Sequence, residues 1–136
     1  MDELGNAQII ERLKHCNITL TQQRVEIAGI LFAKPQHLSA EQVLERVNKD
    51  SATVSKATVY NTLGLFARKG LINEVIVDPS KIFYDSNTHP HYHFYHADTG
   101  KLEDIPASAV TLEHLPELPA GTHQERVDII IRVNKN

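Results

Sequence analysis

The sequence predicts an α+β fold, with a mostly helical first half followed by a second half built mainly of strands. Three observations predict it. Apolar residues recur at helical spacing through residues 6–69, they recur at strand spacing after residue 70, and histidines concentrate in the strand-like half. With 136 residues, of which 41% are hydrophobic and 23% charged, the chain can form one domain or two small ones and is too apolar for global disorder.

The composition excludes several classes of protein. No apolar run approaches the ~20 residues of a membrane-spanning helix, and the N-terminal residues lack the pattern of a secretory signal, so we expect a cytoplasmic protein without membrane association. The single cysteine, Cys16, excludes an internal disulfide and every cysteine-rich zinc module. The net charge of −3 argues against attraction of nucleic acid over the whole surface, but a local basic face remains compatible with it.

Three short helices are predicted in the first half. Residues 6–15 carry apolar side chains on one side, and Thr21 can cap a second helix that ends before Pro35. Ser39 and Gln42 form a capping-box pattern that opens the third helix. Helices of this kind occur in many small domains, so they do not by themselves indicate a function.

The fourth predicted helix, residues 56–69, has two different faces. Ser55 can cap it and Gly70 can end it. One face carries a stripe of apolar residues at spacing i, i+4, i+7, formed by Val59, Leu63 and Phe66. The opposite face offers small residues, a flat ring and an amide, contributed by Ala57, Tyr60, Asn61 and Gly64. An asparagine can pair with adenine through two hydrogen bonds and a tyrosine can pack on a thymine methyl, so this face suits DNA.

A hairpin is predicted after the fourth helix, with strands at residues 71–78 and 81–85. Helices followed by such a hairpin form a winged helix-turn-helix, the usual architecture of a DNA-binding domain. A purely structural three-helix bundle with a β-ribbon is the alternative interpretation of the same pattern.

The second half is organised around residues 89–96, which hold four of the eight histidines of the chain. On the strand predicted there, His91 and His93 point to the same face, because side chains alternate along a strand. Neutral imidazoles and carboxylates are common ligands of borderline divalent metals, which favours a metal site. A run of solvated histidines on an exposed strand is the alternative.

Two aspartates are placed to join these histidines. Asp85 lies just upstream, and Asp104 lies on the strand that returns after the turn signal at residues 98–100. With a two-residue loop, Asp104 falls opposite Tyr95 on the histidine face, whereas a three-residue loop turns it away.

The remaining elements of the second half complete a small sheet. We expect strands at residues 91–97 and 101–105, a short helix at 106–115 and a final strand at 126–133. A bare edge on that last strand tends to pair with another chain, which favours a dimer.

Three motifs in this order resemble those of the ferric uptake regulator (Fur) superfamily. They are Leu20-Thr-Gln-Gln-Arg24, Ser55-Lys-Ala-Thr-Val-Tyr-Asn-Thr-Leu63, and a block with Tyr84-Asp85, His91-Tyr-His93, Thr99-Gly-Lys and Asp104. The likeness covers about residues 6–133. Within the superfamily, Asn61 and the aspartates at positions 85 and 104 are more similar to the peroxide-sensing PerR branch. The Phe94-Tyr95 pair and the missing cysteine pairs resemble the haem-reading Irr branch.

The resemblance implies a dimeric DNA-binding repressor and not an enzyme. Residues 1–84 would form a winged-helix DNA-binding domain and residues 85–136 a small α/β domain for dimerisation and metal sensing. The partners implied are a second copy of the chain and a palindromic double-stranded DNA operator. The residues expected to contact DNA are Lys14, Arg24, Lys56, Ala57, Thr58, Tyr60 and Asn61.

The resemblance also implies one regulatory divalent metal per chain, Fe2+ or Mn2+, with Zn2+ possible in vitro. Its five ligands would be His37, Asp85, His91, His93 and Asp104. His37 is predicted to lie in a loop, so the metal would clamp the first domain to the second. A structural zinc bound by four cysteines, which many members hold through two Cys-x-x-Cys pairs, is not expected, because His96 and Thr99 stand at the first pair's positions.

Three functions therefore follow from the sequence. A peroxide-responsive repressor is the leading hypothesis, and a haem- or iron-responsive regulator similar to Irr is the alternative. In that alternative His96 or His89 would serve as a haem or second-metal ligand. A non-haem iron oxygenase, with His91, His93 and Asp104 as its facial triad, is a remote third interpretation, against which stands the lack of a substrate-pocket signature.

Overall fold

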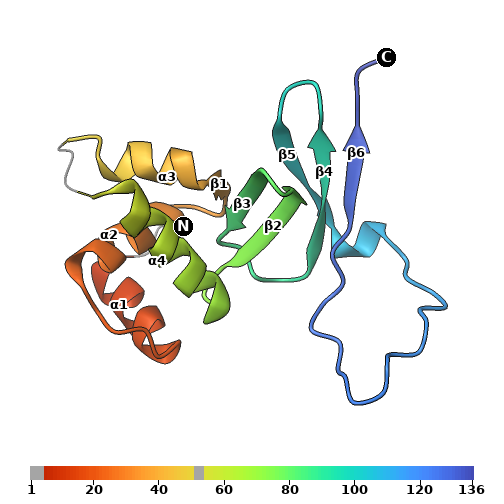
Figure 1. Ribbon diagram of the computed structural model, residues 1–136, viewed down its shortest axis with the longest axis horizontal. Coiled ribbons are helices and arrows are strands. Elements are labelled where there is room, and N and C mark those ends of the chain that lie inside the picture. The colour runs from red at the N-terminus through yellow and green to blue at the C-terminus, as the bar shows by residue number, and fades with distance from the viewer. Residues whose placement is uncertain (1–4, 51–53) are drawn as a thin grey trace. The chain divides into compact units, whose positions relative to one another are not determined.

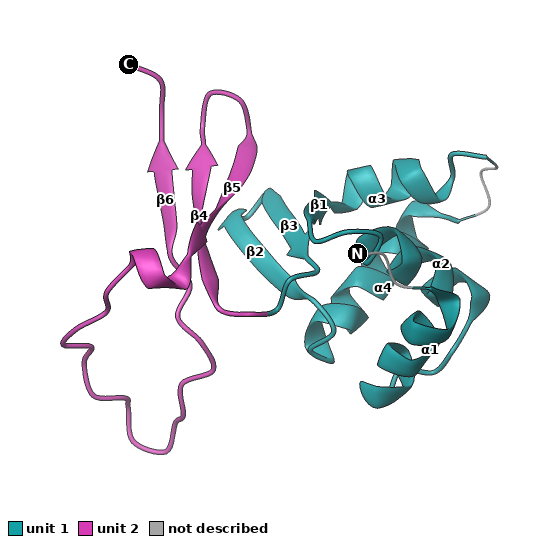
Figure 2. Ribbon diagram, turned by 180° about the vertical axis from the view of Figure 1, so that it is seen from behind, with its two compact units in different colours: residues 1–88 teal, residues 89–136 magenta. Residues whose placement is uncertain are grey.

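The computed structural model describes residues 5–50 and 54–136 and has the predicted α+β class. The chain divides into two compact units, Met1–Thr88 and His89–Asn136, shown in teal and magenta in Figure 2. The predicted division of labour, with DNA binding by residues 1–84 and dimerisation by residues 85–136, concerns function and stays a prediction. Within the described ranges no helix is long and apolar enough to cross a membrane.

All four predicted helices are present in the first unit (Figure 1). They are α1 (Asn6–His15), α2 (Gln22–Leu31), α3 (Ala40–Val47) and α4 (Lys56–Arg68). Thr21, Ser39 and Ser55 cap α2, α3 and α4, each accepting a hydrogen bond from a backbone N–H three residues further on. In α3 the side chain of Gln42 also bonds back to the backbone N–H of Ser39, which completes the predicted capping box.

The core of the first unit lies between these helices. The predicted stripe on α4 is buried, since Val59, Leu63 and Phe66 are each 0% exposed. They pack in one cluster with the buried faces of the other helices, represented by Leu13, Ile27, Leu31 and Val43. Gly70, just beyond α4, has φ of +78° and ends the helix as predicted, because glycine adopts this left-handed conformation without strain.

A three-stranded antiparallel sheet completes the first unit, with the strand order β1-β3-β2. Strands β2 (Asn73–Asp78) and β3 (Lys81–Asp85) form the predicted hairpin, although β2 starts two residues later than predicted. The short strand β1 (His37–Ser39) was not predicted: His37 lies on this strand and not in a loop. Its partner is β3, far along the chain, and such non-local pairing leaves no local sequence signal.

The second unit contains a three-stranded sheet with the order β5-β4-β6. Strand β4 (His91–His96) lies between its neighbours, antiparallel to β5 (Lys101–Pro106) and parallel to β6 (Ile130–Val133) (Figure 1). Tyr95, Leu102 and Ile105 are buried in this unit.

Two predictions for the second unit were wrong. The helix expected at residues 106–115 is reduced to one 3-10 turn, η1 (Ala107–Ala109), and residues 110–129 form neither helix nor strand. Pro116 disfavours helical backbone at Leu115, and His114 has φ of +59°, which no right-handed helix contains. The final strand, expected over residues 126–133, is also shorter than predicted, since only Ile130–Val133 pairs with β4.

Candidate metal centre

The register of β4 and β5 brings three predicted ligands together. His93 faces Asp104 directly across the two strands, and His91 lies two residues before His93 on the same face. The connecting loop is residues 97–100, four residues long, and so matches neither the two-residue nor the three-residue alternative. A four-residue loop differs from a two-residue loop by an even number, so Asp104 lies on the same face as the histidines.

The imidazole of His91 is oriented by a hydrogen bond to the backbone. Its Nδ1 lies 2.6 Å from the carbonyl oxygen of His89, and since a carbonyl can only accept, Nδ1 carries the hydrogen and donates it. In the neutral imidazole Nε2 is then the nitrogen with the lone pair, and it lies 3.8 Å from Oδ1 of Asp104. Metal-binding histidines commonly have one nitrogen fixed in this way, so His91 has the arrangement of a preorganised ligand.

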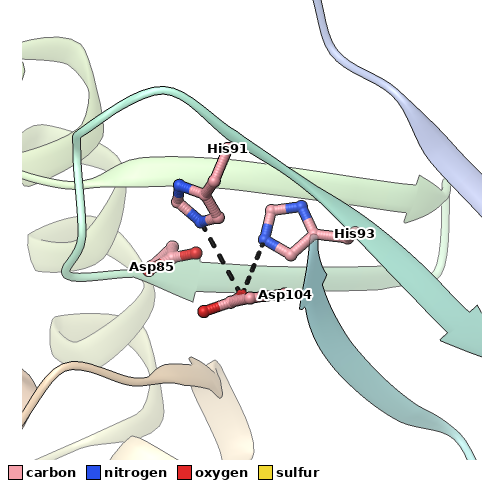
Figure 3. Close-up of side chains that lie close together, drawn as sticks. All are labelled: Asp85, His91, His93 and Asp104. Atoms are coloured by element: carbon pink, nitrogen blue, oxygen red, sulfur yellow. Dashed lines mark ion pairs between the residues drawn. The ribbon is translucent and has the colours of Figure 1, made fainter. Parts of the chain in front are cut away.

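Distances within the group are those of ligands around one ion (Figure 3). Oδ1 of Asp104 lies 3.4 Å from Nε2 of His93 and 3.8 Å from Nε2 of His91. The two imidazole rings are 4.7 Å apart at an angle of 67°. Two donors that each lie about 2.1 Å from one metal are about 3–4 Å apart, so the three side chains fit a divalent metal with little movement.

The first unit holds the other two predicted ligands, His37 and Asp85, as direct neighbours on β1 and β3. Asp85, also drawn in Figure 3, is 1% exposed and accepts a hydrogen bond from the backbone N–H of Asn87. Gln36 and Ser86 flank the pair and fasten the strands, since the Ser86 N–H donates to the Gln36 carbonyl at 3.0 Å and the Gln36 N–H to Ser86 Oγ at 3.2 Å. Within this unit, then, the backbone holds His37 opposite Asp85.

His96 and His89 lie elsewhere. Nε2 of His96 bonds to Oε1 of Glu103 at 2.8 Å, a cross-strand pair at the far end of β4. His89 is exposed and contributes its carbonyl oxygen to His91. Within residues 5–50 and 54–136, neither histidine belongs to a group of three or more potential metal ligands.

The predicted DNA-contacting residues belong to three helices of the first unit. Lys14 is exposed in the last turn of α1, and Lys56, Ala57, Tyr60 and Asn61 are exposed on α4. Arg24 has a structural partner, because its guanidinium donates to the Thr19 carbonyl at 2.7 Å. Thr58 also has a structural partner, because its hydroxyl accepts a hydrogen bond from the hydroxyl of Ser55, the N-cap residue of α4.

A network around Tyr60 was missed by the sequence reasoning. The Tyr60 hydroxyl donates a hydrogen bond to Oε2 of Glu41 in the first turn of α3, and the ammonium of Lys56 lies 5.7 Å from the centre of the Tyr60 ring. The hydrogen bond from Tyr60 lowers the pKa of the Glu41 carboxyl, with a smaller effect of Lys56 and Lys81, and it raises the pKa of Tyr60. The proton therefore stays on the tyrosine and the negative charge on Glu41.

A winged-helix unit followed by a small sheet whose histidine and carboxylate side chains could hold a metal ion is the architecture of a metal-binding regulator. The sequence model of the Ferric uptake regulator family matches residues 15–128, and the chain belongs to this family.

Individual relatives agree with this placement. The peroxide-responsive repressor PerR of Staphylococcus aureus is 33% identical over 96 residues, which is 71% of this chain and 65% of the length of that relative. The structure of Helicobacter pylori Fur, described as having three functional metal-binding sites, has a TM-score of 0.71 at 17% identity and covers 99% of this chain and 94% of its own. Pseudomonas aeruginosa Fur with manganese has a TM-score of 0.69 at 22% identity, covering 93% and 96%. At these identities the two structures show the fold alone.

Proposed function

We propose that the protein is a cytoplasmic, metal-dependent transcriptional repressor that binds a palindromic DNA operator as a homodimer and responds to peroxide. The single observation that carries the metal dependence is the group of His91, His93 and Asp104, with Nδ1 of His91 already bonded to a backbone carbonyl. Such an arrangement favours metal binding over a cluster of solvated histidines. The lone pair of a neutral His91 and the Asp104 carboxylate face each other, and two acceptors placed in this way are stabilised by a cation between them.

Five residues would hold the metal. His91, His93 and Asp104 come from the second unit, and we propose that His37 and Asp85, neighbours on β1 and β3, complete the set. Three imidazoles and two carboxylates suit Fe(II) or Mn(II), and Zn(II) in vitro. Since the ligands come from both units, binding of one ion would restrict the units to one arrangement. If loss of the metal removed even ~3 kcal/mol of the preference for that arrangement, the population of the arrangement relative to the others would fall more than a hundredfold.

The proposed DNA-binding surface is the exposed face of α4. Its Tyr60 and Asn61 would read base edges in the major groove, while Lys14 and Lys56 would contact phosphates. A dimer is supported by Leu112, Leu115 and Leu118, which are 39%, 51% and 49% exposed in this chain, because a second copy could cover them.

Peroxide is proposed as the signal because Asn61, Asp85 and Asp104 resemble the residues of the peroxide-sensing branch and a PerR protein is among the relatives. Fe(II), when bound, would supply the redox chemistry, and His37 or His91 would be oxidised. Haem as the signal is the competing hypothesis, with His96 as the candidate ligand. The family consists of regulators, which decides against the oxygenase interpretation.

The test is metal analysis of the protein purified without oxygen, followed by peptide mass spectrometry after stoichiometric peroxide. We expect one divalent metal per chain and the addition of an oxygen atom to His37 or His91, together with loss of DNA binding. His93→Gln should abolish metal binding, whereas His114→Gln, in an imidazole that is 93% exposed, should behave as wild type.

Two outcomes would count against the proposal. A protein that binds haemin with a Soret band and then releases DNA, without histidine oxidation, would establish the haem-responsive alternative. A His93→Gln variant that retains the full metal content would remove the candidate metal centre.

A further inference from the structure

The network of Glu41, Tyr60 and Lys56 has a consequence for how α4 could read DNA. Tyr60 is 37% exposed and lies beside Asn61 on the face proposed to enter the major groove. Its hydroxyl has one hydrogen, and that hydrogen is donated to Oε2 of Glu41. What the hydroxyl can still offer a ligand is its oxygen lone pair.

We propose that Glu41 is a positioning residue for sequence recognition: by accepting the Tyr60 hydrogen, it makes the Tyr60 oxygen an obligate acceptor for the exocyclic amine of an adenine or cytosine. In the major groove only adenine N6 and cytosine N4 present such a donor. A phosphate or a carbonyl, both acceptors, cannot pair with an oxygen whose hydrogen is already committed. This inference rests on the proposed DNA-binding function.

The charges around the network support this role. Glu41 stays ionised, because the hydrogen bond from Tyr60 lowers its pKa and the positive charges of Lys56 and Lys81 act in the same direction. An ionised carboxylate beside a DNA-contacting helix repels phosphates, so Glu41 weakens binding to every sequence alike. In return it fixes the polarity of one hydrogen bond, which is how a repulsive group can raise specificity.

Lys56 connects the effect of Glu41 on DNA affinity with its effect on specificity. Its ammonium lies over the Tyr60 ring, close enough to attract both the ring face and the Glu41 carboxylate. Removal of the Glu41 charge would leave Lys56 available to one additional phosphate. We therefore expect loss of Glu41 to raise affinity for random DNA while lowering discrimination, a combination that a purely structural residue would not produce.

The experiment begins with selection of duplexes from a randomised pool by the Mn(II)-loaded full chain. Binding of the selected duplex and of a scrambled duplex is then measured by fluorescence anisotropy over a range of salt concentrations. For Glu41→Ala we expect the ratio of the two affinities to fall roughly 3- to 10-fold, the value of about one hydrogen bond. The slope of log affinity against log salt concentration should steepen by the amount expected for about one additional phosphate contact.

Three single variants and one double variant separate polarity from charge. Glu41→Gln removes the charge but keeps an acceptor oxygen, so it should gain affinity for random DNA and keep the wild-type ratio. Tyr60→Phe should lower the ratio of the two affinities by as much as Glu41→Ala does. The double variant Glu41→Ala/Tyr60→Phe should lower this ratio no further than either single variant. Glu45→Ala removes an exposed charge from the same helix and should leave the ratio unchanged.

A base analogue identifies the amine directly. Purine in place of the preferred adenine, or 2-pyrimidinone in place of cytosine, should weaken wild type roughly 3- to 10-fold, again the value of about one hydrogen bond. It should weaken Glu41→Ala less, because a Tyr60 hydroxyl without Glu41 can donate to an acceptor as well as accept from an amine. Additive losses in the double variant, or an unchanged ratio for Glu41→Ala, would overturn the role of Glu41. A wild-type chain that selects no sequence would instead reject the proposed function itself.

Discussion

Lys56 and Asn61 illustrate how two exposed residues of α4 could act on DNA in different ways. Both are exposed, but Asn61 offers a donor and an acceptor at fixed spacing, whereas the ammonium of Lys56 is a charge without directional preference. Under the proposed function, binding to bases and binding to phosphates would therefore be carried by different residues of α4.

We expect Asn61→Ala to cost ~1–3 kcal/mol on the selected duplex and to relax base preference at one position. Lys56→Ala should weaken all sequences alike and flatten the salt dependence. Anisotropy titrations with selected and scrambled duplexes measure both effects. If Asn61→Ala loses equal affinity for the two duplexes, the amide does not read a base.

Asp104 is the residue on which the proposed signal depends most directly. Its side chain is 54% exposed, so a longer carboxylate has room at this position. We expect Asp104→Glu to bind metal and DNA but to lose DNA binding much more slowly after peroxide. The added methylene allows both oxygens to reach the metal, which would occupy the position that peroxide needs.

The measurement is DNA binding as a function of time after peroxide, for wild type and variant in parallel. Glu103→Asp, a change of equal size on the neighbouring residue, serves as the control and should lose binding at the wild-type rate. Equal rates for Asp104→Glu and wild type would shift the interpretation toward haem.

The grouping of His91, His93 and Asp104 could be anticipated from residue types and strand parity, whereas His37 was named only through the family resemblance. The Glu41–Tyr60 bond could be predicted from neither. The face of Asp104 depends only on whether the loop has an odd or even number of residues, so the sequence left two alternatives and the four-residue loop selects the one that faces the histidines. Glu41 and Tyr60 are on different helices, and their contact depends on how α3 packs against α4. No periodicity in the sequence encodes that packing.

Among the elements, α4 combines a fully buried apolar stripe with the proposed recognition face. Phe66 is 0% exposed at the centre of the first unit's core, and truncating such a residue leaves a cavity. We expect Phe66→Ala to lower the free energy of unfolding by about 3–5 kcal/mol, a large share of the ~5–15 kcal/mol typical of a domain.

Thermal and urea denaturation followed by circular dichroism provide the measurement. Ile76→Ala, on β2 where the side chain is 54% exposed, is the matched control and should change stability by less than ~1 kcal/mol. A small effect of Phe66→Ala would mean that the core around α4 is looser than its burial indicates.

Elements were predictable where local signals agreed with packing, as in α2, α3 and α4 with their capping residues. The helix expected at residues 106–115 failed because its apolar residues do not find a buried surface within the described chain: Leu112 and Leu115 remain 39% and 51% exposed. Helices gain most of their stability from packing an apolar face. Strand β1 was missed for the opposite reason, because its stability comes from a distant strand.

For the whole molecule, the question is what a metal contributes to the folded state. Each unit has buried apolar residues of its own, exemplified by Leu63 and Phe66 in the first and by Tyr95, Leu102 and Ile105 in the second. Neither set includes a residue proposed to bind the metal. Cys16 is the single cysteine, so no tetrathiolate zinc holds the second unit together.

We therefore expect a strong chelator to abolish DNA binding and to leave a folded dimer. Removing the regulatory ion would free the two units from one fixed arrangement without exposing either core, whereas removing a structural zinc would unfold the unit that holds it. Circular dichroism reports the fold, light scattering after size exclusion reports the dimer, and anisotropy reports DNA binding. Re-addition of Mn(II) should restore binding. If chelation instead produces monomers or unfolding, a structural metal is present, and His96 with its partner Glu103 is the first place to look for it.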